Sequence, residues 1–161
     1  MKYQSHFALS ALVTTLMSTA LLANATTNKA AYLFTQAAKA VSVVACKDKS
    51  QCDDQVTFSK LNDQVTYFSD RPARLNGEVG LSSFLQKWAK GANNFKQDHP
   101  NASLVYFDGT KMKQHIVELS HPHYDAAKNT LTYNVKLLSQ TTMIPGQYMY
   151  GVLFIDSWQW F

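Results

Sequence analysis

The sequence has only two cysteines and contains none of the short motifs that mark common enzyme classes. No serine lies in a G-x-S-x-G context, and neither G-x-x-x-x-G-K nor G-x-G-x-x-G occurs. These absences give no support to an α/β-hydrolase, a P-loop enzyme or a dinucleotide-binding enzyme. The adjacent carboxylates Asp53 and Asp54 point to opposite sides of an extended chain, so they do not indicate a shared acid–base site. We therefore predict no catalytic residue and favour a protein that is not an enzyme.

Runs of one charge are also missing. The 15 lysines and arginines exceed the 11 aspartates and glutamates by only four, and no basic run occurs. A dedicated nucleic-acid surface requires a basic patch or stripe. Nucleic acid is therefore not an expected partner.

Only one long apolar stretch occurs, from Phe7 to Leu22, and hydroxyl residues interrupt it. It ends in Ala23-Asn24-Ala25, the small-x-small pattern that signal peptidase cuts. A retained membrane anchor is the alternative, but the stretch is short for a membrane span. We predict a signal peptide at 1–25 and a single β-rich domain at 26–161, exported to the periplasm or the medium without stable membrane insertion.

Cys46 and Cys52 bracket a short polar segment. Two cysteines this close in an oxidising compartment predict a disulfide that fixes the end of a hairpin. A metal or redox pair is the alternative, although redox pairs prefer the C-x-x-C spacing, which is not present here.

Most of the mature chain has the character of strands. Alternating or β-branched runs cover 31–44, 55–61, 65–68, 102–107, 115–119, 131–138 and 150–155. Asn62 and Asp63 supply turn chemistry and predict a hairpin between the second and third runs. The run at 150–155 is apolar throughout, which suits a strand buried on both faces. The alanine-rich middle of 31–44 leaves a helix open as an alternative there.

One helix is expected at 81–88, because Leu81, Phe84, Leu85 and Trp88 fall on a single helical face and Gly80 stands at its start. We therefore predict a mainly β (α+β) fold with about six or seven antiparallel strands and one amphipathic helix. A β-sandwich is the expected arrangement, with a partly open barrel as its variant. A membrane barrel would account for the aromatic C-terminus, but the helix does not suit a barrel wall.

A box of residues begins at Tyr67-Phe68-Ser69-Asp70-Arg71-Pro72 and continues through Arg74 and Gly77. Phe84, Trp88, Gly91, Phe95 and Asp98, followed by Pro100-Asn101-Ala102, extend the pattern. It resembles a family of small uncharacterised exported bacterial proteins with a YFSDRP-x-R-x-x-G box. The resemblance implies a shared exported fold and assigns no activity, cofactor or site residue.

Asp70, Arg71 and Arg74 form the most concentrated polar group in the sequence. Two guanidinium groups beside a carboxylate predict a site for an anionic ligand, bound bidentately. The alternative is a structural turn in which Asp70 accepts backbone N–H groups.

His121, His123 and Asp125 are the candidate metal ligands. Their spacing in an extended chain sends all three side chains to one side, and imidazole with carboxylate suits Zn²⁺ or Cu²⁺. His115 is a candidate fourth ligand from a neighbouring strand. A solvated loop is the alternative interpretation of this segment.

Trp158 and Trp160 lie at the end of the chain. If their rings are exposed, they would bind a sugar or a partner protein; the alternative is that they fold back and cover the core. Together these features favour a non-enzymatic exported module that binds an unknown protein or a small anionic ligand. The alternative function is a metal-binding protein or metal-dependent hydrolase that uses His121, His123 and Asp125.

Overall fold

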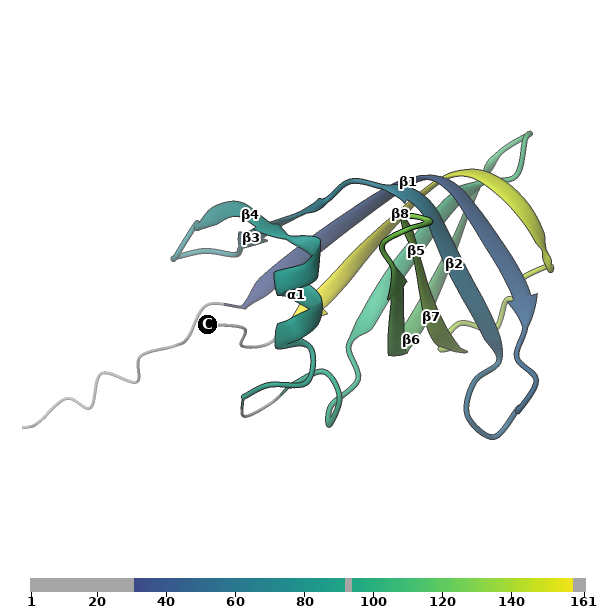
Figure 1. Cartoon of the computed structure of the whole chain (residues 1–161), viewed down its shortest axis with the longest axis horizontal. Helices are drawn as coiled ribbons and strands as arrows, with labels where there is room; N and C mark the ends of the chain where they lie inside the picture. Colours follow the sequence, from purple (N-terminus) through teal and green to yellow (C-terminus); the bar gives the residue numbers. More distant parts are fainter. Residues whose placement is uncertain (1–30, 92–93, 158–161) are drawn as a thin grey trace, which may run out of the picture.

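The structure, a computed structural model, describes residues 31–91 and 94–157 (Figure 1). Eight strands and one short helix follow one another along this part of the chain. They are β1 (Tyr32–Ala45), β2 (Asp54–Leu61), β3 (Gln64–Ser69), β4 (Asn76–Gly80), α1 (Leu81–Lys87), β5 (Asn101–Phe107), β6 (Met112–Asp125), β7 (Thr130–Leu137) and β8 (Gly146–Ser157). The predicted signal peptide at 1–25 and the terminal Trp158 and Trp160 lie outside the described residues.

Six strands close into an antiparallel barrel. Their order is β2-β7-β6-β5-β8-β1, and β1 also pairs with β2, so the sheet returns to its start. The 14 residues of β1 explain this closure, because Tyr32–Val43 pair with β8 on one edge and Ala38–Ala45 pair with β2 on the other. The predicted mainly β, antiparallel fold with one helix is confirmed. The predicted sandwich is wrong, because pairing on both edges of β1 joins all six strands into one sheet.

The predicted hairpin at 55–68 is also wrong. β2 and β3 do not pair with each other; both run antiparallel to β1, β2 along its C-terminal part and β3 along Tyr32–Thr35. The Asn62 amide donates to the carbonyl of Ala37 in β1, so the chain bends here without turning back. β3 then pairs with β4, and this hairpin extends beyond the barrel (Figure 1).

Side chains fill the interior of the barrel. Along β5 and β7 every second residue is buried, which places Leu104 on one strand and Leu131, Tyr133 and Val135 on the other at 0% exposure. Six strands enclose a narrower space than the eight that just hold a filled core. Gly151 fits this narrow space, because a Cβ atom there would overlap the side chain of Val41.

A cluster of aromatic rings closes one end of the barrel. Phe84 in the middle of α1 and Trp88 at its C-terminal end are buried and pack against Phe95. The ring of Phe84 lies 5.2 Å from that of Phe34 in β1, and the ring of Trp88 lies 5.5 Å from that of Tyr133 in β7. The predicted helix and its buried face are thus confirmed, and α1 forms a plug (Figure 1).

Loops surround the opposite end. The β1–β2 loop carries the predicted disulfide, Cys46–Cys52, and the Cys46 amide donates to the Asp53 carbonyl across the hairpin end. The β5–β6 turn contains Asp108-Gly109, with Gly109 at φ +94°. The segment between β7 and β8 completes this end (Figure 1).

The outer face of the barrel is partly apolar. β8 forms where the apolar run predicts a strand, but only one face is buried, because Tyr150 is 63% and Phe154 is 38% exposed. Within residues 31–91 and 94–157, no helix has the length and hydropathy that crossing a bilayer requires.

Replacing Trp88 by Ala should lower the free energy of unfolding by about 3–5 kcal/mol, because it removes a buried ring and leaves a cavity. Chemical denaturation of the purified protein measures this loss. Phe68→Ala is the matched control, since Phe68 is 46% exposed on the projecting hairpin. Equal losses in the two variants would contradict the role of Trp88 as a plug.

Gly151→Ala should destabilise the barrel by about 1–3 kcal/mol through overpacking against Val41. Val41→Ala alone should also destabilise it by leaving a cavity. The double variant should lose less stability than the sum of the two single losses, because each change makes room for the other. Strictly additive losses in chemical denaturation would show that the two positions do not pack as described.

Candidate functional site

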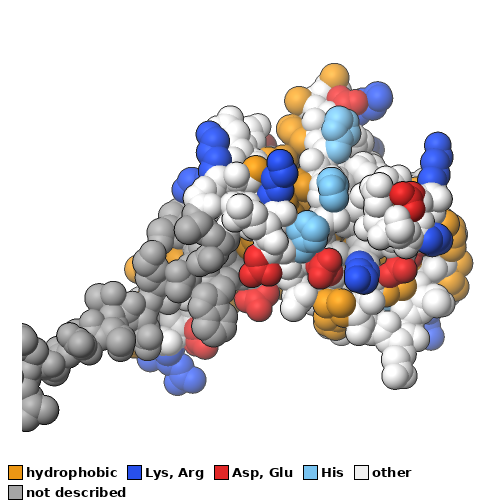
Figure 2. Space-filling model, turned by 90° about the horizontal axis from the view of Figure 1, so that it is seen from below, with side chains coloured by type: hydrophobic (Ala, Val, Ile, Leu, Met, Phe, Trp, Pro, Cys, Tyr) orange, Lys and Arg blue, Asp and Glu red, His pale blue; other side chains and the backbone are white. Residues whose placement is uncertain are grey.

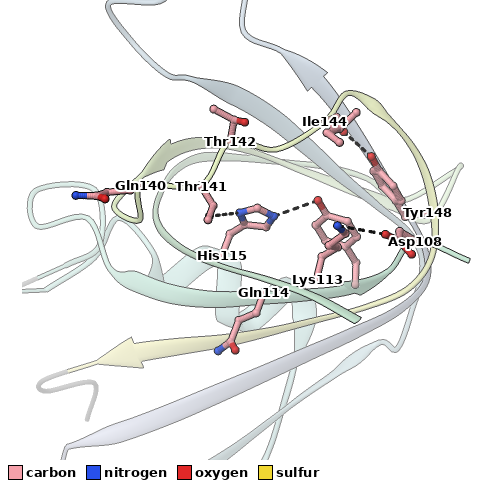
Figure 3. Close-up of a pocket in the computed structure, with 10 residues that line it drawn as sticks. Asp108, Lys113, Gln114, His115, Gln140, Thr141, Thr142, Ile144 and Tyr148 are labelled. Atoms are coloured by element: carbon pink, nitrogen blue, oxygen red, sulfur yellow. Dashed lines mark hydrogen bonds and ion pairs between the residues drawn. The ribbon is translucent and has the colours of Figure 1, made fainter. Parts of the chain in front are cut away.

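A cavity of about 440 Å³ opens at the end of the barrel opposite α1 (Figure 3). We call it the barrel mouth. Three segments contribute to it: the β5–β6 hairpin, the loop between β7 and β8, and the start of β8. Its lining consists of Tyr106, Asp108, Lys113, Gln114, His115, Gln140, Thr141, Thr142, Ile144 and Tyr148.

His115 lies at the centre of the barrel mouth (Figure 3). Strand alternation points it inward with Val117 and Leu119, and it is 5% exposed. Its Nε2 lies 3.3 Å from the Tyr106 hydroxyl, and its Nδ1 lies 3.1 Å from the hydroxyl of Thr141. Both ring nitrogens therefore have partners, which fixes the orientation of the imidazole.

Two tyrosine rings form the wall beside His115. The rings of Tyr106 and Tyr148 lie 4.5 Å apart, and the Tyr148 hydroxyl donates to the Ile144 carbonyl at 2.6 Å (Figure 3). The ring of Tyr106 also stacks on that of His115, with 16° between the two planes. Burial raises the pKa of Tyr106 to about 12, so its hydroxyl stays protonated at neutral pH.

The rim of the barrel mouth carries one ion pair. Lys113 Nζ lies 3.4 Å from Asp108 Oδ2 (Figure 3). Hydrogen bonds from the Thr110 hydroxyl and from the amides of Lys111 and Thr110 hold the pKa of Asp108 well below its usual range. The carboxylate is therefore charged, and the pair is neutral as a whole.

The charge state of His115 follows from its surroundings. Burial lowers its pKa, and the charge of Lys113 adds to this effect, while Thr141 and Asp54 act in the opposite direction. The imidazole is therefore neutral at pH 7, with one nitrogen donating and the other accepting.

Asp54, which lies close enough to act on the pKa of His115, is 6% exposed, and burial raises its own pKa. Within residues 31–91 and 94–157, no group donates a hydrogen bond to its carboxylate.

A second hollow, of about 410 Å³, lies on the outside of the barrel. We call it the outer cleft. The β1–β2 disulfide loop forms one wall, and outward-facing residues of β6 and β7 form the other. It contains Lys49, His99, Glu118, Ser120, His121 and Lys136 among its lining residues. Histidine side chains also follow one another on the face of the molecule shown in Figure 2.

The predicted anion site around Arg71 lies at the tip of the β3–β4 hairpin. Asp70, Arg71 and Arg74 are all exposed, and the tip is far from the barrel mouth (Figure 1). The Asp70 carboxylate accepts the Arg71 amide at 2.6 Å, and the Asp70 carbonyl accepts the Arg74 amide at 3.2 Å. Asp70 thus makes the hydrogen bonds expected of a structural turn, and the anion site stays a prediction.

The predicted metal ligands do not gather at one point. His121 lies in the outer cleft, whereas Asp125 forms an ion pair with Lys128 at 3.1 Å beside the β6–β7 turn. His123 is exposed on the strand between them. Over the described ranges 31–91 and 94–157, no three His, Cys, Asp or Glu side chains are grouped so that they could hold a metal ion. A site for Zn²⁺ or Cu²⁺ at these residues stays a prediction.

Sequence reasoning missed the barrel mouth, although one signal for it is present. The Asp108-Gly109 turn sets the register in which Tyr106 pairs with Lys113, so Tyr106 and His115 are diagonal neighbours on the inner face. The contribution of Thr141 and Tyr148 left no comparable signal, because both come from a distant part of the sequence.

The comparisons add no family to this geometry, since no family model, curated protein or solved structure matches the chain. The resemblance based on the Arg71 box therefore stays a prediction.

Proposed function

We propose that this protein is an exported, non-enzymatic binding module that takes a small neutral saccharide into the barrel mouth. The observation that carries the proposal is the lining of the mouth, which combines the Tyr148 ring with hydroxyl, amide and imidazole groups. An aromatic ring offers a flat apolar face to the C–H face of a sugar. The hydroxyl and amide groups of the rim match sugar hydroxyls, because both kinds of group donate and accept hydrogen bonds.

The charge of the site favours a neutral ligand. The ion pair between Asp108 and Lys113 cancels the two charges of the rim, and the lowered pKa of His115 keeps the imidazole neutral. An ionic ligand would have to bind without an unpaired opposite charge in the lining. The cavity volume is within the range of small-molecule sites, about 300–1,000 Å³.

The hydrogen bonds of His115 support binding rather than catalysis. A general base needs a free nitrogen directed at the reacting proton. Here the two nitrogens of His115 already face Tyr106 and Thr141, so the imidazole organises the wall of the site. Export is supported by the Cys46–Cys52 disulfide, because disulfides persist in oxidising compartments.

The binding proposal is tested by titrating isotope-labelled protein with N-acetylglucosamine and with glucose and following the backbone amide resonances. Shifts should concentrate at Thr141, His115 and Tyr148. Tyr148→Ala should weaken binding at least about tenfold, since it removes the stacking face. Tyr150→Ala is the matched control, because Tyr150 lies two residues away in β8 and is 63% exposed outside the lining. Saturating shifts that are unchanged in Tyr148→Ala, or no shift with any neutral sugar, would contradict the proposal.

Stability should depend on pH through His115. Because burial lowers the pKa of His115 in the folded protein, the unfolded chain binds more protons below the ordinary value of 6.5. The free energy of unfolding should therefore fall as the pH drops from about 6.5 through the folded pKa of His115. Asp54, whose pKa is raised by burial, acts in the opposite direction at lower pH.

Thermal unfolding between about pH 7.5 and about pH 5 measures this effect of His115. His115→Gln should reduce the loss of stability on acidification, whereas His123→Gln, at an exposed position, should retain it. The same pH dependence in both variants would show that His115 is not the titrating group.

A further inference from the structure

The outer cleft has the features of a second, separate binding site. It lies on the outer surface of β6 and β7, whereas the barrel mouth lies at the end of the barrel, and the two share no lining residue. The disulfide between Cys46 and Cys52 holds the loop that forms its outer wall, and the Asp53 carboxylate accepts the Leu137 amide at 2.7 Å on the neighbouring strand. The two walls are therefore fixed relative to each other.

A bulge in β6 directs His121 into the outer cleft. His115, Val117 and Leu119 alternate inward, so regular pleating would also point His121 toward the interior. The register with β7 shifts between Ser120 and His123, and His121 adopts a left-handed backbone with φ of 49°. Its side chain is exposed, and its ring lies 6.2 Å from that of His99. Bulges of this kind re-aim side chains at functional sites, and a left-handed histidine is uncommon.

Ser120 brings a side-chain hydroxyl to the same space. The residue is 7% exposed as a whole and lines the outer cleft. Among the described residues its hydroxyl forms no hydrogen bond with another side chain or with the backbone, and it is not enclosed in the interior. It is therefore a donor available to a group bound in the cleft.

The acids of the outer cleft already have partners, while its two lysines form no ion pair among the described residues. Asp53 accepts the Leu137 amide, and Glu118 Oε1 lies 3.4 Å from His99 Nδ1. Lys49 donates to the Asp53 carbonyl, and within residues 31–91 and 94–157 neither Lys49 nor Lys136 forms an ion pair within 4.0 Å. The groups left to contact a ligand are therefore ammonium, imidazole and hydroxyl donors.

We propose that the outer cleft binds a tetrahedral oxyanion, either free phosphate or a phosphate monoester on a larger molecule. Ser120, His121, Lys49 and Lys136 would donate to its oxygens. Donors with positive charge make short, strong hydrogen bonds to phosphate. Asp53 and Glu118 are the acids of the same cleft, and each already has a partner, the Leu137 amide for Asp53 and His99 for Glu118.

The test is a titration of the purified protein with inorganic phosphate and, separately, with glycerol phosphate at one fixed pH, followed by backbone amide resonances. Saturating shifts should concentrate at Ser120, His121 and Lys136. Tighter binding of glycerol phosphate would assign a phosphate monoester, and tighter binding of inorganic phosphate would assign the free ion.

Two variants with a matched control complete the experiment. His121→Asn removes the imidazole but keeps a residue that tolerates a left-handed backbone, and Ser120→Ala removes only the hydroxyl. Each should weaken phosphate binding about fivefold or more, since each deletes one donor to a charged group. His123→Asn, at the exposed histidine two residues away, should leave the affinity unchanged.

Two results would overturn the proposal. The first is phosphate affinity that is the same in wild type, Ser120→Ala and His121→Asn, all three being folded by circular dichroism. The second is Zn²⁺ binding with shifts at His99 and His121 while phosphate produces none, which would assign a metal site instead. Neither of these results depends on whether sugars bind in the barrel mouth.

Discussion

The structure depends on hydrogen bonding along both edges of β1. This strand pairs with β8 over most of its length and with β2 over its C-terminal part, and the ladder with β8 joins the first and last of the described strands. A strand with two partners has no exposed edge, so closure satisfies backbone groups that would otherwise attract other chains. Closure also gives the barrel two distinct ends, one filled by the rings of α1 and one left to loops. Polar side chains line the second end, where the barrel mouth lies.

Local features of the fold could be predicted because they depend on local patterns. Alternation in β7 and the apolar spacing of Leu81, Phe84 and Trp88 report which face of each element is buried. Closure could not be predicted, since it depends on which distant strands pair. The incorrect prediction of a hairpin between β2 and β3 shows what local sequence cannot determine. Turn-forming residues such as Asn62 and Asp63 indicate that the chain changes direction, but not by what angle. β4 escaped prediction because its short sequence, with Gly77, Glu78 and Gly80, has little strand propensity.

The candidate sites show the same difference between local features, which could be predicted, and long-range contacts, which could not. The disulfide followed from spacing and compartment alone. The barrel mouth combines residues from β5, β6 and the β7–β8 loop, so no single window of sequence contains it. The spacing of His121 and His123 indicated a shared direction, but the bulge after Ser120 changes the direction of the chain between them. The structure instead brings His121 close to His99, from the segment before β5, and this neighbour is not visible in the sequence spacing.

The projecting β3–β4 hairpin determines where the sequence of this domain can vary without disturbing the barrel. Closure uses the part of β1 from Ala38 onward, whereas the hairpin attaches to Tyr32–Thr35. Its tip, from Asp70 to Leu75, is exposed and contributes no side chain to the buried core. Substitutions or insertions at this tip leave the closing ladders intact, so its length and chemistry can diverge independently of the barrel. The hairpin is therefore the part of the domain where new recognition properties can arise at the least cost in stability.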